Sequence, residues 1–397
     1  RQMCIRDSAR KGFAEWITRM LKESVGKLHR WSKDEDPTGG TAVNWDEDTS
    51  TFISNPNEIL KMRSKGWGEI WQCDDEKARK RTCDAVRRAR EQAKEEGSRS
   101  TLVATGKKIA EACSSFKKKT SVGLDLWALA ELAECNTADL DRLGLLMMEW
   151  DEEMIAPCQW LVNLLNMIPK KKGHRCVATM ASGYRCFTSL EEDIDKRWNV
   201  EHSHEDDSSK PDSSCLRAAE ERLIEQEMLT ATEYAVLVIL WDFVKFYDTI
   251  HYDVLLQECS NNQYGKRKTA ISMLIHAAPR LLKMNKTVGE MVRSVGRGIV
   301  AGCKRSQSMA KAYTNRHVDM LRRSFIISLP LHIPKGCTAK QEAAIREKNR
   351  FQGGMRVFQH VDDLTQVMWA KNEDELASKA YDSVTMWAKA VRENHAC

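Results

Sequence analysis

The chain has 397 residues, of which 42% are hydrophobic and 30% are charged, and its formal net charge is +5. This composition excludes a disordered or collagen-like protein, and the length allows two or three domains. The mild basic excess is compatible with a nucleic-acid partner but does not require one. The thirteen cysteines are scattered without a CxxC pair, which predicts reduced thiols in an intracellular protein, cytoplasmic or nuclear. No signal peptide or apolar stretch of membrane-spanning length is found in the sequence, so we expect a soluble protein.

The N-terminal part of the chain predicts a charged helical extension. Residues 1–8 contain the stretch MCIRDS, which resembles one reading frame of a sequencing adaptor, so we expect no contribution from them to the fold. Residues 74–119 carry fourteen Lys or Arg against eight Asp or Glu, which is typical either of a nucleic-acid-binding surface or of a solvated helix face. The extension as a whole, residues 9–114, predicts a Pro-, Gly- and Asp-rich linker at 32–58 and helices over 9–30, 58–97 and 102–116.

Residues 199–215 are acidic, polar and poor in apolar side chains, which predicts a mobile surface loop. His202 and His204 stand beside Glu205 and Asp206, and such a set of side chains could bind a metal ion. The sequence offers no second cluster of ligands to accompany it. We therefore favour a solvated loop over a metal site.

An unusually apolar run, residues 234–241, ends on a carboxylate, Asp242. The run is rich in Val, Leu and Ile and too short to cross a membrane, which predicts a strand buried on both faces. A carboxylate without a partner in such a place would cost several kcal/mol. We therefore expect Asp242 to lie at the end of the strand and to bind something positive.

A second pair of carboxylates, Asp362 and Asp363, interrupts another apolar pattern. The alternation around it predicts a hairpin, with Val357 and Val361 on one face of the first strand and residues 364–369 in the second. Alone, such a pair is typical of a solvated turn. Together with Asp242, it supplies the ligands for two divalent cations about 4 Å apart. Hard oxygen ligands favour Mg²⁺, with Mn²⁺ as a substitute, over zinc, and such ions assist displacement at a phosphate.

The stretch that begins at Asp242, DFVKFYDTIHYDVLL, resembles the first palm motif of reverse transcriptases of the non-LTR retrotransposon kind. HVDDL is similar to the family's aromatic-Ala-Asp-Asp signature, and RGIVAGCKRSQSMAKAYTNRHVDML is similar to its glycine-rich element with the following helix. NMIPKKKGHRCVATMASGYRCFTSL and KKTSVGLDLW resemble the fingers segments, so that the five motifs cover residues 115–390 in the family's order. The chain departs from the family pattern at Cys176, Phe246, Tyr247, Ala301, His360 and Val361.

The resemblance implies an α+β fold of the right-hand polymerase type. Residues 115–233 would form the fingers and include the acidic loop 199–215, while residues 234–397 would form part of a palm with an antiparallel sheet. The thumb would be absent, so that the chain is expected to be a fragment of a longer protein. The implied activity is RNA-directed DNA synthesis, in which an RNA template directs the addition of deoxynucleoside triphosphates to the 3′-hydroxyl of a DNA primer.

The resemblance also implies a role for each candidate side chain. Asp242, Asp362 and Asp363 would be the catalytic metal ligands. The Tyr247 ring would lie beneath the sugar and leave no room for a 2′-hydroxyl. Asp248 would cap the helix after the strand. Lys170 and Arg175 would bind the triphosphate, and the backbone at Gly302 would approach the nucleotide closely. Gly298 and Ser306 would contact the template and primer. The alternative for Ser306 is that it simply begins the next helix.

Three other classes of function stay open at the level of sequence. A viral-type RNA-directed RNA polymerase shares the palm and the acidic pair, but Tyr247 argues against it because such enzymes must admit the 2′-hydroxyl. A catalytically decayed nucleic-acid-binding relative fits the departures inside the motifs. A helical scaffold without enzymatic activity would require Asp242 to lie more than about 8 Å from Asp362, too far for a two-ion cluster.

Overall fold

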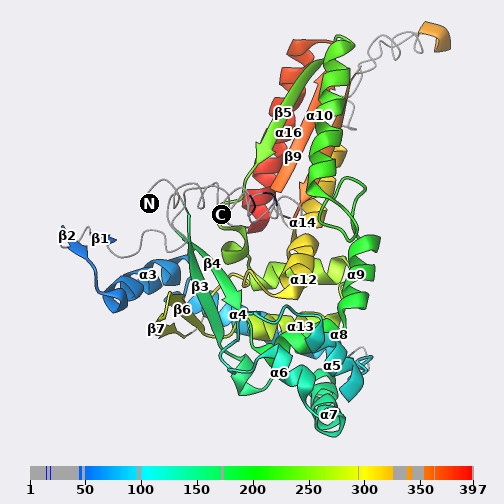
Figure 1. Ribbon diagram of the computed structural model, residues 1–397. Coiled ribbons are helices and arrows are strands. Elements are labelled where there is room, and N and C mark those ends of the chain that lie inside the picture. Colours follow the sequence, from blue (N-terminus) through cyan, green and yellow to red (C-terminus); the bar gives the residue numbers. More distant parts are fainter. Residues whose placement is uncertain are drawn as a thin grey trace.

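The chain is an α+β protein, as the sequence predicts, and Figure 1 shows its computed structural model. The structure describes residues 44–46, 50–95, 100–170, 174–293, 295–324, 338–341, 353–361 and 363–395, together with Glu15 and Thr18. The strands are β1 (Asn44–Asp46), β2 (Thr51–Ile53), β3 (Asn163–Pro169), β4 (His174–Thr179), β5 (Ala235–Trp241), β6 (Arg280–Met284), β7 (Thr287–Val292), β8 (Gly353–His360) and β9 (Asp363–Ala370). The helices are α3 (Pro56–Ile70), α4 (Glu76–Glu95), α5 (Gly106–Ser114), α6 (Leu129–Glu134), α7 (Thr137–Glu153), the 3₁₀ helix η1 (Cys158–Trp160), α8 (Ser182–Leu190), α9 (Glu192–Glu201), α10 (Cys215–Ala231), α11 (Phe246–Thr249), α12 (Tyr252–Asn261), α13 (Lys266–His276), α14 (Lys304–Ser324) and α16 (Glu373–His395).

The N-terminal extension is helical as predicted, but region 58–97 forms two helices, α3 and α4, instead of a continuous one. Helix α3 begins after Asn55, whose side chain accepts a hydrogen bond of 3.0 Å from the Asn57 backbone N–H. Helix α4 buries a face of small side chains, which lets it pack closely on α12 and α13. Helix α5 lies within the predicted 102–116 helix. Apart from Glu15 and Thr18, the helix predicted over 9–30 lies outside the described residues.

A four-stranded mixed sheet has the order β4-β3-β6-β7. Strands β3 and β4 pair antiparallel, whereas β3 and β6 pair parallel and come from distant parts of the sequence. Strand β6 belongs to the predicted palm and β3 to the predicted fingers, so the two predicted divisions share this sheet. Strands β1 and β2 form a separate antiparallel pair within the predicted linker.

A second sheet is antiparallel and has the order β5-β9-β8. Strand β5 pairs with β9 from Ala235 opposite Ala370 to Trp241 opposite Leu364, and β8 pairs with β9 up to His360 opposite Asp363. The predicted hairpin is therefore confirmed. Val361, however, lies in the turn with a φ of 58° and does not share a strand face with Val357, and Asp363, predicted in the turn, is the first residue of β9. Figure 1 shows β5 and β9 alongside α10 and α16, which extend away from the mixed sheet and its helices.

The prediction that β5 is buried on both faces is wrong. Leu240 is 72% exposed and Val238 is 37% exposed. Strand β5 is an edge strand, and only its other face, with Leu237 and Ile239, packs on the cluster that Met368 forms with α16. An apolar run therefore signals a strand here without signalling that both of its faces are covered.

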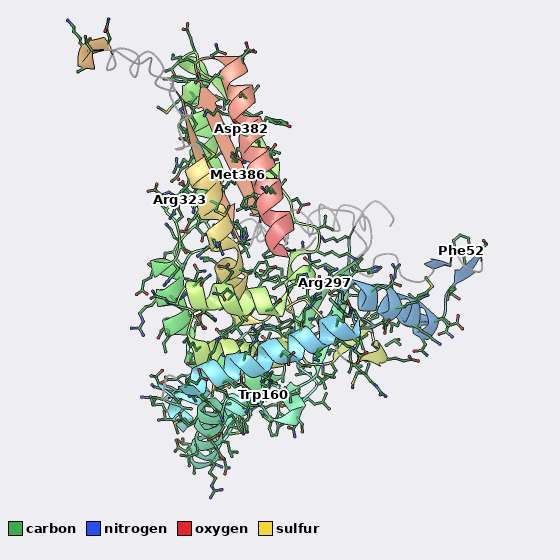
Figure 2. All side chains as sticks on the ribbon, turned by 180° about the vertical axis from the view of Figure 1, so that it is seen from behind. Phe52, Trp160, Arg297, Arg323, Asp382 and Met386 are labelled. Atoms are coloured by element: carbon green, nitrogen blue, oxygen red, sulfur yellow. The ribbon has the colours of Figure 1, made fainter. Side chains whose placement is uncertain are left out.

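One hydrophobic core runs from Ile59 to Val361 and joins all three predicted divisions. Its aromatic centre is Trp160, whose ring centroid lies 5.6 Å from that of Tyr184 and 5.6 Å from that of Phe187. Figure 2, seen from behind, shows α4 running across this part of the molecule above Trp160. None of the helices in the described part of the chain is long and apolar enough to cross a membrane.

Candidate active site

The antiparallel sheet brings Asp242 to the hairpin turn that precedes Asp363. Asp242 directly follows Trp241, which is paired with Leu364, and Asp363 directly precedes Leu364. Facing residues of neighbouring antiparallel strands have their Cα atoms about 4.5 to 5.5 Å apart, so both carboxylates belong to the same end of the sheet. Both residues are exposed. Asp362 lies outside the described residues, and its place in the cluster stays a prediction.

Aromatic contacts anchor the chain on both sides of Asp242. The Trp241 and Trp387 ring centroids are 5.8 Å apart, and the Trp241 indole N–H donates a hydrogen bond of 3.2 Å to the Gln366 side chain. On the other side, the Phe243 ring centroid lies 6.3 Å from that of Trp387. The backbone at Asp242 is thereby held between two packed rings while its side chain faces solvent, which is the arrangement that a ligand for a solvated cation needs.

The segment after Asp242 forms the short helix α11. The Tyr247 ring is half-buried and meets Phe246 edge-on, with the ring centroids 5.5 Å apart. Asp248 lies inside α11, where its carboxylate accepts a hydrogen bond of 2.8 Å from the Trp71 indole N–H. Asp248 lies in the first turn of α11, the helix that follows the strand, so its carboxylate is near the helix N-terminus as predicted. The N-cap residue is Lys245, however, and the Asp248 side chain accepts its hydrogen bond from Trp71. Burial raises the pKa of Asp248, because desolvation outweighs this hydrogen bond and the charges of nearby basic groups.

The glycine-rich loop packs against α11 and β4. Gly298 and Gly302 have φ angles of +92° and +108°, a region that glycine adopts without strain. A Cβ atom at Gly298 would lie 2.6 Å from the Asp248 carbonyl oxygen, and one at Gly302 would lie 2.5 Å from that of Ala178. Both glycines are therefore required by the close approach of backbone segments. Their predicted contacts with the template and the nucleotide stay a prediction.

Ser306 is buried in the first turn of α14, and its hydroxyl donates a hydrogen bond of 2.6 Å to the Val300 carbonyl oxygen. This contact fits the alternative in which Ser306 begins the helix. The predicted template contact would require a different rotamer or a movement of the loop.

The two predicted phosphate-binding residues lie at the end of the β3–β4 hairpin. Lys170 directly follows β3, Arg175 lies on β4, and both are exposed. Strand β4 reaches the glycine-rich loop, because the Ala178 backbone N–H donates a hydrogen bond of 2.7 Å to the Ala301 carbonyl oxygen. The structure thus connects the hairpin of Lys170 and Arg175 to the loop of Gly302 through β4.

The acidic segment 199–215 is not exposed along its whole length, as its composition predicts, because Asp206 and Asp207 are buried. Asp207 is 1% exposed, and its carboxylate lies 2.8 Å from the Lys311 ammonium on α14. Ser209 adds hydrogen bonds of 2.8 Å from its backbone N–H and 2.6 Å from its hydroxyl. Burial alone would raise the pKa of Asp207, but Lys311 and Ser209 together hold it below its ordinary value. Long-range partners that composition does not reveal convert a polar segment into a buried anchor.

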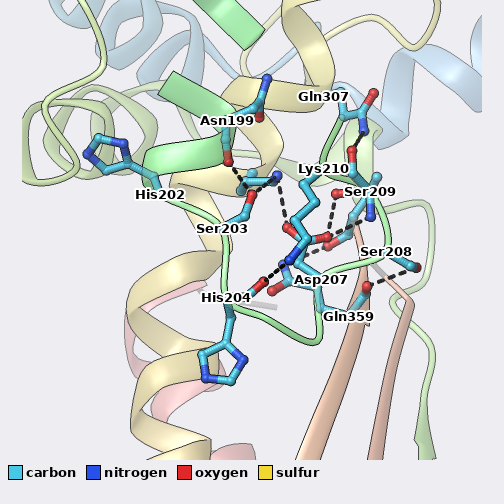
Figure 3. Close-up of polar contacts among 12 residues, drawn as sticks. Asn199, His202, Ser203, His204, Asp207, Ser208, Ser209, Lys210, Gln307 and Gln359 are labelled. Carbon is cyan, nitrogen blue, oxygen red and sulfur yellow. Dashed lines mark hydrogen bonds and ion pairs between the residues drawn. The ribbon is translucent and has the colours of Figure 1, made fainter. Parts of the chain in front are cut away.

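This segment also covers the edge of β8. Asp207 and Gln359 form a parallel bridge, and the Ser208 backbone N–H donates a hydrogen bond of 2.8 Å to the Gln359 carbonyl oxygen (Figure 3). The Ser208 hydroxyl and the Cys215 thiol lie 3.2 Å and 3.3 Å from Nδ1 of His360. Since His360 ends the strand that leads to Asp362, the acidic segment fixes one arm of the hairpin that carries the predicted metal ligands.

The metal site considered at His202 and His204 does not assemble as one group. Ligand atoms of His204, Glu205 and Asp206 lie within 4.8 Å of one another. His202 instead stacks on Trp198, with the ring centroids 4.7 Å apart. The Asp206 carboxylate already pairs with the Arg356 guanidinium, which competes with any cation. The cluster therefore serves as an ion-pair anchor between the acidic segment and β8.

No protein-family model matches the chain, and no curated protein matches it either. The function is therefore inferred from the motifs and from the geometry of the described residues.

Proposed function

We propose that the chain is the fingers and palm region of a retrotransposon reverse transcriptase, an RNA-directed DNA polymerase. It would transfer a deoxynucleotide from its triphosphate to the 3′-hydroxyl of a DNA primer on an RNA template, with release of pyrophosphate. The observation that carries this proposal is the strand register, which places Asp242 beside the turn before Asp363 at one end of an antiparallel sheet. The resemblance to the palm motifs predicts that these two segments, which are distant in the sequence, meet at one end of the sheet.

The donor set fits a pair of hard divalent cations. Asp242 and Asp363 present carboxylates to solvent, and among the described residues neither has a cationic side chain within 4.0 Å. Their charge is thus left for ions such as Mg²⁺ or Mn²⁺, which would be held by Asp242, Asp362 and Asp363. When bound, such ions activate the attacking hydroxyl and neutralise charge that develops on the phosphate.

The protein's own residues would then bind and orient the nucleotide. Lys170 and Arg175 offer cationic donors for the triphosphate at the end of the β3–β4 hairpin. The backbone of Tyr247 is held by a hydrogen bond of 2.8 Å from the Ile299 N–H to its carbonyl oxygen. A ring on so fixed a backbone can exclude a 2′-hydroxyl, which favours DNA synthesis over RNA synthesis.

A catalytically decayed nucleic-acid-binding relative is the second candidate. Exposed basic side chains on α4 favour nucleic-acid binding by the extension, and the departures at Cys176, Ala301 and His360 favour loss of catalysis. Cys176 is buried, where a proline is usual in the family. This candidate predicts binding of a primer and template without incorporation.

Addition of one nucleotide to a DNA primer on an RNA template tests the proposal, because a single addition needs no processive clamp. With Mg²⁺ and protein in excess over primer, we expect incorporation of the complementary deoxynucleotide and much weaker incorporation of the ribonucleotide. Asp362→Asn should bind the primer and template as well as the unaltered protein but add nothing. Binding without incorporation by the folded, unaltered protein would support the decayed relative instead, and a preference for ribonucleotides would support an RNA polymerase.

A further inference from the structure

The corner between α3 and α4 contacts two segments to which the resemblance assigns a role at the nucleotide. They are helix α11, which carries Tyr247, and the glycine-rich loop, which carries Gly298 and Gly302. Trp71 directly follows α3 and has 0% exposure, and Trp67, one turn earlier, has 6%. Their ring centroids are 5.3 Å apart. These rings belong to the N-terminal extension, for which the sequence motifs give no role.

The first set of contacts holds α11, which carries Tyr247. The Trp71 indole N–H donates to Asp248, and the Lys245 ammonium lies 4.3 Å from the centroid of the Trp67 ring. Lys245 itself has a φ of 50°, so it is the residue at which the chain turns into α11. Both ends of the turn that presents Tyr247 are therefore tied to the same helix corner.

The second set of contacts holds the start of the glycine-rich loop. The backbone N–H groups of Gly296 and Arg297 donate hydrogen bonds of 2.8 Å and 3.2 Å to the Trp71 carbonyl oxygen. The Arg297 guanidinium donates one of 2.7 Å to the Ile70 carbonyl oxygen, and Figure 2 shows Arg297 close to α4. The Thr82 hydroxyl on α4 donates one of 2.7 Å to the Gly296 carbonyl oxygen. The loop leaves this corner in a fixed direction.

A buried arginine joins the two sets. The Arg280 guanidinium is fully buried, lies 4.4 Å from the centroid of the Trp71 ring and donates a hydrogen bond to the Gly298 carbonyl oxygen. The Tyr252 hydroxyl donates a second hydrogen bond of 2.9 Å to the same oxygen. Trp71 thus lies between Asp248 of α11 and Arg280, which holds the glycine-rich loop at Gly298.

We propose that Trp71 is a positioning residue for the nucleotide site. It fixes Tyr247 relative to the loop of Gly298 and Gly302, and it makes α3 and α4 an integral part of the polymerase site. This inference rests on the proposed function for its effect on catalysis. The joint positioning of the two loops does not depend on what they bind.

Trp71→Phe tests the inference, because it keeps an aromatic ring against Arg280 and removes the indole N–H that Asp248 accepts. A hydrogen bond to a charged group changes an equilibrium constant roughly tenfold or more. We expect the KM for the deoxynucleotide in the single-addition assay to rise by about that factor, with a smaller change in kcat, and discrimination against the ribonucleotide to weaken. Hydrogen–deuterium exchange should become faster at the amides of Asp248, Gly298 and Ile299.

Trp198→Phe is the matched control. Trp198 is 7% exposed and donates its indole N–H to the Asn262 carbonyl oxygen at 2.9 Å, as Trp71 does to Asp248, but it lies on α9. We expect this variant to lose stability without a change in KM or in the exchange of the two loops. Equal effects of the two substitutions, or unchanged exchange in Trp71→Phe, would overturn the inference. Absence of incorporation by the unaltered protein would instead count against the proposed function, while the exchange measurement still decides the role of Trp71.

Discussion

Asp242→Asn is expected to lower the rate of nucleotide addition at least about a thousandfold while the fold stays intact. Metal ions in such sites stabilise the transition state by several kcal/mol, and each 1.36 kcal/mol corresponds to a factor of about ten in rate. An asparagine keeps the shape of the side chain but loses the charge that holds the ion. Because Asp242 is exposed, its replacement should leave the thermal midpoint of unfolding nearly unchanged.

The control for this prediction is Asp382→Asn, the same substitution at an exposed position on α16 (Figure 2). It should leave both the rate of addition and the thermal midpoint unchanged. Rates and midpoints are measured on the same protein preparations. If Asp242→Asn added nucleotides at close to the unaltered rate, Asp242 would not be a metal ligand.

Lys311→Met is expected to lower the free energy of unfolding by about 3 to 5 kcal/mol, because it leaves the Asp207 carboxylate buried without its partner. The two side chains are 0% and 1% exposed in the ion pair. Urea unfolding measures the loss. Arg217→Met is the matched control: its pair with Glu221 has side chains that are 80% and 45% exposed, and exposed pairs contribute about 0 to 1 kcal/mol. Equal losses in the two variants would contradict the account of the acidic segment as a buried anchor.

The pH dependence of this loss has a definite sign. The lowered pKa of Asp207 means that the ion pair contributes its full stability above the ordinary aspartate pKa, about 3.9, and loses it as the pH falls through the lower folded value. In Lys311→Met, burial is no longer opposed by the ammonium, so that acid protonates Asp207 more readily. The gap in unfolding free energy between the two proteins should therefore narrow as the pH falls from the pKa of Asp207 in the folded variant to the lower pKa of Asp207 in the folded unaltered protein.

The sequence predicts individual strands of the antiparallel sheet, but it does not predict which strand faces are covered or which distant strands pair. Apolar runs and period-two alternation identify β5 and the β8–β9 hairpin, because the pattern that indicates a strand extends over only a few neighbouring residues. Burial of Leu240 is mispredicted because a pattern does not say which strands lie at an edge. The parallel pairing of β6 with β3, which crosses the predicted fingers and palm, has no local signal either. The domain limits themselves stay a prediction.

The candidate site follows the same division. Asp242 and Asp363 can be proposed as metal ligands from the sequence, because a carboxylate directly beside an apolar strand suggests a bound cation. Trp71 and Asp207 are missed because their importance comes from single partners far away in the chain, Asp248 and Lys311. In the sequence, a tryptophan or an acidic loop of this kind does not stand out, because nothing local identifies its distant partner.

The most direct test of the central claim is anomalous scattering from crystals that contain a primer, a template, Mn²⁺ and a deoxynucleoside triphosphate. Three aspartates that form one metal cluster predict two manganese peaks about 4 Å apart, contacted by Asp242 on one side and by the turn of Asp362 and Asp363 on the other. Ordered carboxylates and bound nucleotide with no manganese between them, or an Asp242 more than about 8 Å from Asp362, would contradict the account.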